Sequence, residues 1–379
     1  MKGSVPITLA DVCESVRYGY TASASLDPVG PRFLRITDIV PECLDWESVP
    51  YCEIDESDKE RVALAVGDIV VARTGATVGY AKLIREPVDA VFASYLVRFR
   101  VDQERADPNF VGRLIESTVY KSFVQSRIGG SAQPNASAPV LGSFKFNLPR
   151  REAQTRIADI LSSYDDLIEN NRRRMGLLEE AARLLYQEWF VRLRFPGHEH
   201  THITNGVPEG WQSMPLESAI VLQRGFDLPT QDRQDGEVPI YGSTGICGNH
   251  NKAKVSGPGV VTGRSGTLGE VSYVREDYWP LNTALWVKEF RRVPPLFALF
   301  LLQSLDLKQY NGGVSVPTLD RKSVHRVEVL IPSARFLSMF DELIATQFAQ
   351  IANLTCQNQK LRAARDLLLP RLMSGELAV

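Results

Sequence analysis

Cysteine is scarce in this chain, and none of its 5 cysteines belongs to a CxxC pair. Their odd number and wide spacing indicate neither a disulfide framework nor a cysteine-bound zinc ion, so we interpret them as reduced thiols. Runs of about 18 uninterrupted apolar residues are missing, and the N-terminus has neither the apolar core nor the cleavage site of a signal peptide. The sequence therefore predicts a cytoplasmic protein that does not interact with membranes.

Motifs of common enzyme classes are missing as well. No GxGxxG follows an expected strand, and there is no GxSxG nucleophile elbow and no NPPY-like methyltransferase motif. The stretch GPGVVTGRSG resembles a phosphate loop only loosely, because Pro258 and Arg264 stand where glycine and lysine are required. Asp165 and Asp166 fall on an expected helix, where a solvated face is the ordinary place for carboxylates. We expect no catalytic residues in this chain.

One stretch does match a metal motif, since residues 198–202 read HEHTH and satisfy HExxH. A peptidase motif of this type must lie on a helix so that His198 and His202 share a face, with Glu199 as the base. Prolines and glycines surround the letters and make such a helix improbable. We interpret residues 196–211 as a hinge and expect no metal, and we keep a zinc hydrolase as the alternative from a different functional class.

Composition sets the scale of the fold. The chain has 379 residues, of which 44% are apolar and 23% charged, which is ordinary for folded protein and long for a single core. The formal net charge of -2 does not suggest a nucleic-acid partner. A local basic face can exist despite that total, so charge leaves the question of nucleic-acid binding open.

The most informative feature is an internal repeat. Residues 129–189 lie on residues 312–372 without a gap, so that Pro134 matches Pro317 and Pro149 matches Pro332. Upstream, residues 68–79 (DIVVARTGATVG) match residues 259–269 (GVVTGRSGTLG), and residues 17–20 match residues 223–226. The chain is one design used twice.

Each copy has two parts. The first part contains short apolar runs separated by glycine, proline and asparagine, which is typical of a mixed globular head of strands, turns and a few helices. The second part has apolar residues at alternating steps of four and three, the spacing of a coiled-coil seam. The expected seam residues are Ile157, Leu161, Tyr164, Ile168, Asn171, Met175, Leu178, Ala182, Leu185 and Trp189, and in the second copy Phe340, Ile344, Gln347, Ile351, Leu354, Asn358, Leu361, Arg365, Leu368 and Leu372.

These parts predict an α+β fold with two similar mixed α/β heads separated by two long antiparallel helices that form a coiled coil, related by a pseudo-twofold internal repeat. The expected divisions are a first head at 1–149, a first helix at 150–195, the hinge at 196–211, a second head at 212–332, and a second helix with a C-terminal tail at 333–379. Pro370 is expected to end the second helix early. Two separate amphipathic helices, each covering its own head, are the alternative.

Two matched loops are the best candidates for binding. ARTGATVG and GRSGTLG each follow an apolar strand with an arginine, hydroxyl residues and two glycines, a combination that suits phosphate or guanine and also suits a plain hairpin turn. The proline-containing segments GGSAQPNAS and GGVSVPT could read bases or only cap turns. The candidate DNA-binding residues are Arg17, Tyr20, Arg73, Thr74, Thr77, Gln133, Asn135, Arg224, Tyr241, Ser243, Thr244, Arg264, Ser265 and Thr267.

The whole pattern resembles the specificity subunit of Type I restriction-modification enzymes. The resemblance is carried by LPRREAQTRIADILSSYDDLIENNRRR, the PEGW entry to the second head, and the series IYGSTG, GRSGTLG and WPLNTALWV, and it covers nearly the full chain. One departure is that the second helix lacks the glutamine of PRREAQ and has Gln347 and Arg365 in its seam. We therefore expect looser helix pairing in that portion.

The resemblance implies a non-catalytic subunit that reads double-stranded DNA. Each head would be a target recognition domain for one half of an interrupted sequence, and the helices would set the spacer. Two methyltransferase subunits and ATP-dependent endonuclease/translocase subunits would be the partners, so S-adenosylmethionine, ATP and Mg would be cofactors of those subunits and not of this chain. The alternative within this class is a related system with a fused methyltransferase-nuclease partner. Arg264→Ala should then weaken reading of one half-site, whereas equal loss on every sequence would indicate a phosphate contact.

Overall fold

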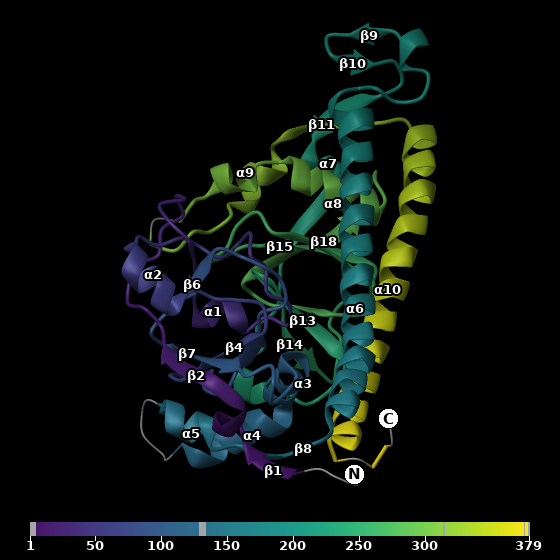
Figure 1. Ribbon diagram of the computed structural model, residues 1–379. Helices are drawn as coiled ribbons and strands as arrows, with labels where there is room; N and C mark the ends of the chain where they lie inside the picture. The colour runs from purple at the N-terminus through teal and green to yellow at the C-terminus, as the bar shows by residue number, and fades with distance from the viewer. Residues whose placement is uncertain (1–4, 129–133, 314, 375, 378–379) are drawn as a thin grey trace. The chain divides into compact units, whose positions relative to one another are not determined.

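The computed structural model describes residues 5–128, 134–313, 315–374 and 376–377. It consists of two compact units, unit 1 with Met1–Asn170 and Gln357–Val379, and unit 2 with Asn171–Cys356. Each unit contains one head and part of each of two long helices, α6 (Arg151–Tyr186) and α10 (Ala334–Ser374), which Figure 1 shows in teal and yellow-green. None of the described helices is both long and apolar enough to cross a membrane.

The head of unit 1 is built on an antiparallel four-stranded sheet. In spatial order its strands are β2 (Cys13–Tyr18), β7 (Leu96–Val101), β4 (Asp68–Ala72) and β5 (Ala81–Leu83). The inner strand β4 reads DIVVA and is buried throughout. Because successive side chains point to opposite faces, Ile69 and Val71 enter one apolar cluster, whereas Val70 and Ala72 enter another. The continuous apolar run thus marks a strand covered on both sides.

Two layers cover this sheet. On one face lie α3 (Pro108–Ile115), α4 (Thr118–Arg127) and α5 (Ala138–Gly142), which contribute Phe110, Tyr120 and Leu141 to the apolar cluster. On the other face lie the parallel pair β3 (Arg32–Leu34) and β6 (Ala90–Phe92) with the short helices α1 (Ile36–Ile39) and α2 (Glu56–Val62). A further antiparallel pair, β1 (Val5–Thr8) and β8 (Lys145–Leu148), leads the chain into α6, and η1 (Ala10–Val12) joins β1 to β2.

The head of unit 2 repeats this arrangement. Its four-stranded antiparallel sheet has the order β12 (Ile220–Arg224), β18 (Ala284–Phe290), β15 (Gly259–Gly263) and β16 (Val271–Val274). A parallel pair, β13 (Val238–Gly242) and β17 (Trp279–Pro280), and an antiparallel pair, β11 (Gln212–Pro215) and β19 (Glu328–Ile331), match their counterparts in unit 1. The additional strand β14 (Gly245–His250) pairs with β13. The helical elements are α7 (Leu216–Ala219), η4 (Thr230–Asp232), α8 (Pro295–Ser304), η5 (Leu307–Tyr310) and α9 (Arg321–His325).

Close backbone approaches also recur in the two heads. A Cβ atom on Gly19 would lie 2.2 Å from the carbonyl oxygen of Phe92, and one on Gly225 would lie 2.2 Å from that of Leu281. Only glycine fits at either position, because the obstacle is backbone that cannot move aside. The predicted α+β fold with an internal repeat is confirmed.

The two long helices pack against each other in antiparallel fashion within each unit. In unit 1 the side-chain amide of Asn358 donates to the carbonyl of Ile168 at 3.2 Å. In unit 2 the ring centroid of Phe340 lies 6.0 Å from that of Tyr186, and Thr355 on α10 donates to the sulfur of Met175. Residues with higher numbers on α6 therefore contact residues with lower numbers on α10, as an antiparallel coiled coil requires.

Seam residues serve the heads as well as the helix pair. Ile157 and Leu161 belong to the main apolar cluster of unit 1, and Phe340 and Ile344 belong to that of unit 2. The seam positions that are buried are Ile157, Leu161, Ile168, Asn171, Ala182, Trp189, Phe340, Ile344, Leu354, Asn358 and Leu372, and those partly buried are Tyr164, Met175, Leu178, Leu185, Gln347, Ile351, Leu361, Arg365 and Leu368. The same side chains thus pack the two helices together and cover the cores of the heads.

Three positions of the second helix led us to expect looser pairing: the missing glutamine, Gln347 and Arg365. The expectation was wrong at the first and the last of them. The place of Gln154 in the first copy is taken by Leu337, which is buried in the core of unit 2. The guanidinium of Arg365 donates to Asp165 on α6 at 2.6 Å. At Gln347 the expectation has support, because its buried side-chain oxygen has no hydrogen-bond partner among the described residues.

The helix ends also differ from the predicted ones. Pro370 lies inside α10, which continues to Ser374. Pro370 and Asp366, the residue whose carbonyl loses its helical N–H partner, are both exposed, and the helix tolerates the proline near its end. The α-helical part of α6 stops at Tyr186 and continues as a π-helical turn, Gln187–Val191 (η2), which allows the consecutive Trp189 and Phe190 to be buried together.

A buried histidine is expected to make the stability of unit 2 depend on pH. The Nε2 atom of His325 accepts the backbone N–H of Leu222 at 3.0 Å, and burial lowers the pKa of the imidazole despite the opposing effect of the Glu217 carboxylate. The unfolded histidine, with an ordinary pKa of 6.5, takes up a proton more readily than the folded one. His325 should therefore contribute full stability above that value and lose it as pH falls below it.

Melting temperatures measured between neutral and mildly acidic pH test this contribution. The wild-type chain should lose more stability on acidification than His325→Asn, whose side chain cannot titrate. Parallel curves for the two proteins would contradict the assignment.

Candidate nucleic-acid interface

The arginine loop of the first head follows β4 and is held by backbone hydrogen bonds. The carbonyl of Arg73 accepts the N–H of Ala136 at 2.8 Å, and the N–H of Gly75 donates to the carbonyl of Pro134 at 3.0 Å. Gly75 has a φ of 77°, a left-handed value that favours glycine. The loop thus pairs with the segment around Asn135, which fixes the guanidinium-bearing residue in place.

The arginine loop of the second head follows β15 and has the same bonds. The carbonyl of Arg264 accepts the N–H of Leu319 at 2.8 Å, and the N–H of Gly266 donates to the carbonyl of Pro317 at 2.9 Å. Gly266 is also left-handed, with a φ of 89°. The match between the two loops in sequence is therefore a match in backbone geometry, and Asn135 corresponds to Thr318.

Side chains at the two loops differ in chemistry. In the first head the guanidinium carbon of Arg73 lies 4.7 Å from the ring centroid of Tyr18, and its Nη2 donates to the amide oxygen of Asn135 at 3.3 Å. The phenolic oxygen of Tyr18 accepts the N–H of Ala138 at 3.0 Å. We call Tyr18, Arg73 and Asn135 the first-head cluster. It holds a planar guanidinium in one orientation and leaves several of its N–H groups for a ligand.

In the second head the equivalent place is a basic pocket of about 600 Å³. Its lining includes Arg224, Arg264, Arg321 and Lys322, together with Thr318 and Asp320. The guanidinium of Arg264 donates to the backbone carbonyl of Asn282 at 3.2 Å. We call Arg224, Arg264, Arg321 and Lys322 the second-head cations.

Most other predicted candidates lie near these loops. Thr74 pairs with Asn135 and Ser265 pairs with Thr318 in isolated β-bridges, and the backbone carbonyl of Thr77 accepts the N–H of Tyr80. The backbone of Ser243 lies close to the second loop. A Cβ atom added to Gly263 would collide with the carbonyl oxygens of Thr267 and Ser243. Arg17 and Thr244 are exposed, on β2 and after β13, whereas Gln133 lies outside the described residues, as do Gly129 and Gly130 of the repeat.

Two aromatic candidates pack against the cores of their heads, Tyr241 buried and Tyr20 partly buried. Tyr241 is 8% exposed and packs edge-on against Tyr278, so its ring lies in the core, and we remove it from the DNA-binding candidates. Tyr20 packs against the cluster around Phe92. Their pattern in the sequence did not distinguish a binding tyrosine from a packing one.

Sequence reasoning also missed three residues. Tyr18 lies in the matched stretch 17–20 but was not chosen as a candidate, and no motif marked Arg321 and Lys322, although all three stand at the loops. The ungapped repeat alignment already places Arg321 and Lys322 opposite Ala138 and Pro139, and that change from neutral to cationic residues was the available signal.

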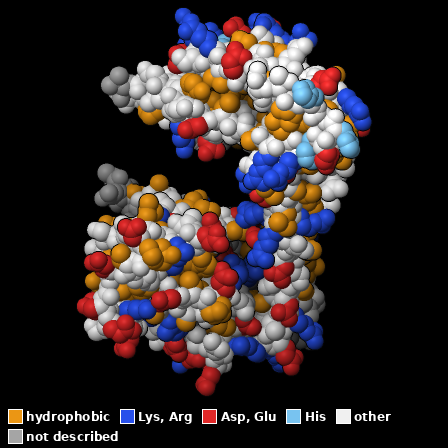
Figure 2. Space-filling model, turned by 90° about the horizontal axis from the view of Figure 1, so that it is seen from above, with side chains coloured by type: hydrophobic (Ala, Val, Ile, Leu, Met, Phe, Trp, Pro, Cys, Tyr) orange, Lys and Arg blue, Asp and Glu red, His pale blue; other side chains and the backbone are white. Residues whose placement is uncertain are grey.

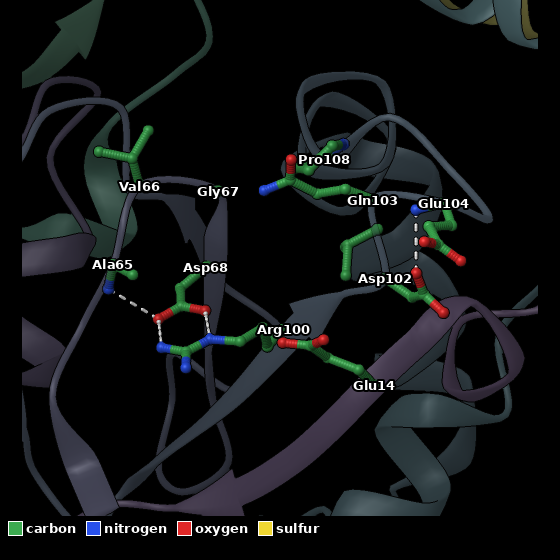
Figure 3. Close-up of a pocket in the computed structure, with 11 residues that line it drawn as sticks. Glu14, Ala65, Val66, Gly67, Asp68, Arg100, Asp102, Gln103, Glu104 and Pro108 are labelled. Carbon is green, nitrogen blue, oxygen red and sulfur yellow. Dashed lines mark hydrogen bonds and ion pairs between the residues drawn. The ribbon is translucent and has the colours of Figure 1, made fainter. Parts of the chain in front are cut away.

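A second pocket, of about 560 Å³, lies at the opposite end of the sheet in unit 1 (Figure 3). Asp68 begins β4, whereas Arg73 follows its last residue. The Asp68 carboxylate accepts two hydrogen bonds from Arg100, both at 2.7 Å, and this pairing raises the pKa of the guanidinium. The remaining charged lining residues, Glu14, Asp102 and Glu104, are acidic. This pocket would repel phosphate and is not a candidate for DNA.

The hinge does not form a peptidase site. Residues 198–200 make a single 3-10 turn (η3, His198–His200), and a small hairpin follows with β9 (Ile203–Thr204) and β10 (Val207–Pro208). His198 and His202 therefore do not share a helical face. Among the described residues, no group of three or more histidine, cysteine, aspartate or glutamate side chains is arranged to hold a metal ion. Figure 2 shows histidine atoms at the surface, with acidic and basic side chains intermingled over the visible face.

Comparison with known proteins agrees with this architecture of two matched heads on paired helices. The family profile described as Type I restriction modification DNA specificity domain matches residues 1–180 and 208–360. The chain is 22% identical to the MjaIX specificity subunit of Methanocaldococcus jannaschii, with 82% of this chain and 78% of that protein covered. It is 21% identical to the HindI specificity subunit of Haemophilus influenzae, with 86% and 91% covered.

A solved structure shows the same fold. The S subunit of a Type I restriction-modification system from M. genitalium aligns with a TM-score of 0.56 at 15% identity, and the alignment covers 98% of this chain and 96% of that one. This chain belongs to the family of Type I restriction-modification DNA specificity domains.

The first-head cluster leads to a test of base reading. Arg73→Ala should remove one bidentate contact, worth about 1–3 kcal/mol of discrimination at a single base pair. Arg73→Lys should not restore this discrimination, because an ammonium group can neither form a bidentate hydrogen-bond pair nor stack on a ring as a guanidinium does. Selection from a random duplex pool should give a motif relaxed in one half only. A motif relaxed in both halves, or unchanged, would contradict this role.

Proposed function

We propose that this chain reads a bipartite, interrupted DNA sequence, one half-site with each head. The observation that carries the proposal is that one backbone framework appears twice with different side chains at matched positions. Tyr18 corresponds to Arg224 and Asn135 to Thr318 at the two arginine loops. A shared framework gives both heads the same mode of docking, and different side chains at the loops allow the two heads to contact DNA in different ways.

The chain itself is proposed to be non-catalytic. Its polar clusters at the loops consist mainly of arginine, lysine, amide and hydroxyl groups, which bind bases and phosphates. The one carboxylate among the described residues of the second-head pocket, Asp320, already accepts hydrogen bonds at both of its oxygens. Methyl transfer to adenine from S-adenosylmethionine is assigned to methyltransferase subunits, and ATP- and Mg-dependent translocation and cleavage to endonuclease subunits.

Apolar side chains on the outer faces of the helices support two equivalent sites for a methyltransferase partner. The repeat places Ile160 opposite Leu343 and Leu184 opposite Leu367, and all four are exposed, by 36%, 49%, 46% and 67%. Unit 1 contains Ile160 and Leu367, and unit 2 contains Leu184 and Leu343. Within unit 2, Leu184 and Leu343 lie within about one helical turn of the contact between Tyr186 and Phe340. Each unit thus presents one such pair, which predicts two copies of one partner.

Methylation mapping of the host genome tests the proposed function. With the chain present, a single bipartite motif with adenine modified in both halves is expected, and it should disappear when the gene for the chain is deleted. A continuous motif, or a bipartite motif that survives the deletion, would contradict the proposal. Co-purification of one partner type in place of two would favour the fused methyltransferase-nuclease system.

Partner docking has its own test. The double variant Leu184→Asp with Leu343→Asp should reduce the number of methyltransferase subunits per chain from two to one, as measured by the mass of the purified complex. Leu177→Asp is the matched control, because Leu177 is 70% exposed on α6 but the repeat pairs it with Lys360. Two bound subunits in the double variant would show that these leucines do not form the docking site.

A further inference from the structure

The basic pocket of the second head is lined by more cationic side chains than carboxylates. The second-head cations line it, and among the described residues of the lining the only carboxylate is that of Asp320. Both oxygens of Asp320 are already used, since one accepts the N–H of Lys322 at 3.1 Å and the other the hydroxyl of Ser323 at 2.6 Å. These bonds lower the pKa of Asp320, so the carboxylate caps α9 in its charged form.

The cations themselves have weak or neutral partners. Arg224 approaches Asp227 only to 3.6 Å, at the surface, and Asp227 also accepts a hydrogen bond from the side chain of Asn282. Arg264 uses a neutral backbone carbonyl. Arg321 and Lys322 are exposed, and no hydrogen bond or ion pair links their side chains to the described residues. Their N–H groups are therefore available to an anion.

The first head shows that the fold does not require these charges. There the places of Arg224, Arg321 and Lys322 are taken by Tyr18, Ala138 and Pro139. Tyr18 and Ala138 close the junction with a neutral hydrogen bond of 3.0 Å between the backbone N–H and the phenolic oxygen. In the second head two cations stand at these same two positions, next to Arg264. Like charges so placed repel one another, and a shared anion would convert the repulsion into attraction.

We propose that the basic pocket binds a backbone phosphate of duplex DNA, and that Arg264 with its three neighbours positions the second head without reading a base. The inference rests on the proposed function. The two matched arginines would then have different roles. Arg73 is held by an aromatic ring and an amide, which suits base reading, whereas Arg264 belongs to a group of like charges, which suits a phosphodiester. A bound phosphate would accept N–H donors from several of these side chains at once.

The salt dependence of DNA binding distinguishes the two roles. With the full-length chain and its co-purified partners on a duplex of random sequence, Arg321→Ala should weaken binding equally on every sequence and reduce the slope of log affinity against log salt by about 1. Arg321→Lys should retain the slope, because a phosphate accepts a point charge. Arg326→Ala, a charge removed just beyond the pocket in the turn that ends α9, should leave the slope unchanged.

Each other outcome has a definite meaning. A slope change no larger than that of Arg326→Ala overturns the inference, and so does a loss confined to particular base pairs with the slope retained. If inorganic phosphate raises the melting temperature of the wild-type chain while Arg321→Ala binds duplex DNA normally, the pocket takes a free anion, and the assignment to DNA is wrong. Absence of duplex binding by the wild-type chain would instead contradict the proposed function.

Discussion

Burial of the seams of α6 and α10 stabilises both compact units at once. Each helix contributes to both compact units, so neither head is completed by its own stretch of chain alone. Unit 1 takes Leu372 of the last helix into its core, and unit 2 takes Ala182 and Tyr186 of the first. The two heads are therefore joined by continuous helices whose inner faces are already committed to packing.

Polar groups add specificity to that packing. In unit 1 Asp165 on α6 pairs with Arg113 of the head and with Arg365 of α10. Glu42, in a head loop, pairs with Arg362 at 2.7 Å and with Arg365 at 3.5 Å. Partly buried ion pairs of this kind add little net stability but fix register, because a slip of either helix would separate the charges. They orient the first head on its helices, whereas the aromatic rings around Phe340 serve that purpose in unit 2.

Much of this fold could be predicted from the sequence because it is repeated. The offset that aligns the two copies located the helices, their seams and the two arginine loops. The heptad spacing implied that the helices pair, and the globular head between them implied that they pair in antiparallel fashion. Features that depend on tertiary context could not be predicted in this way. The strand β14 has no counterpart in the first copy, and Pro370 is tolerated because its side of the helix is exposed. The candidate site was predicted at Arg73 and Arg264, but Tyr18 and Arg321 reach those loops only through the pairing of strands and turns far apart in the chain.

We propose that two heads with one framework read two half-sites at a separation set by the helices. Lengthening both helices by one heptad keeps the seam in phase and adds about 10 Å of helix, which corresponds to about three base pairs of DNA. Methylation mapping with this variant should return the same two half-sites with a longer gap between them. Altered half-sites, or the original gap, would contradict the account.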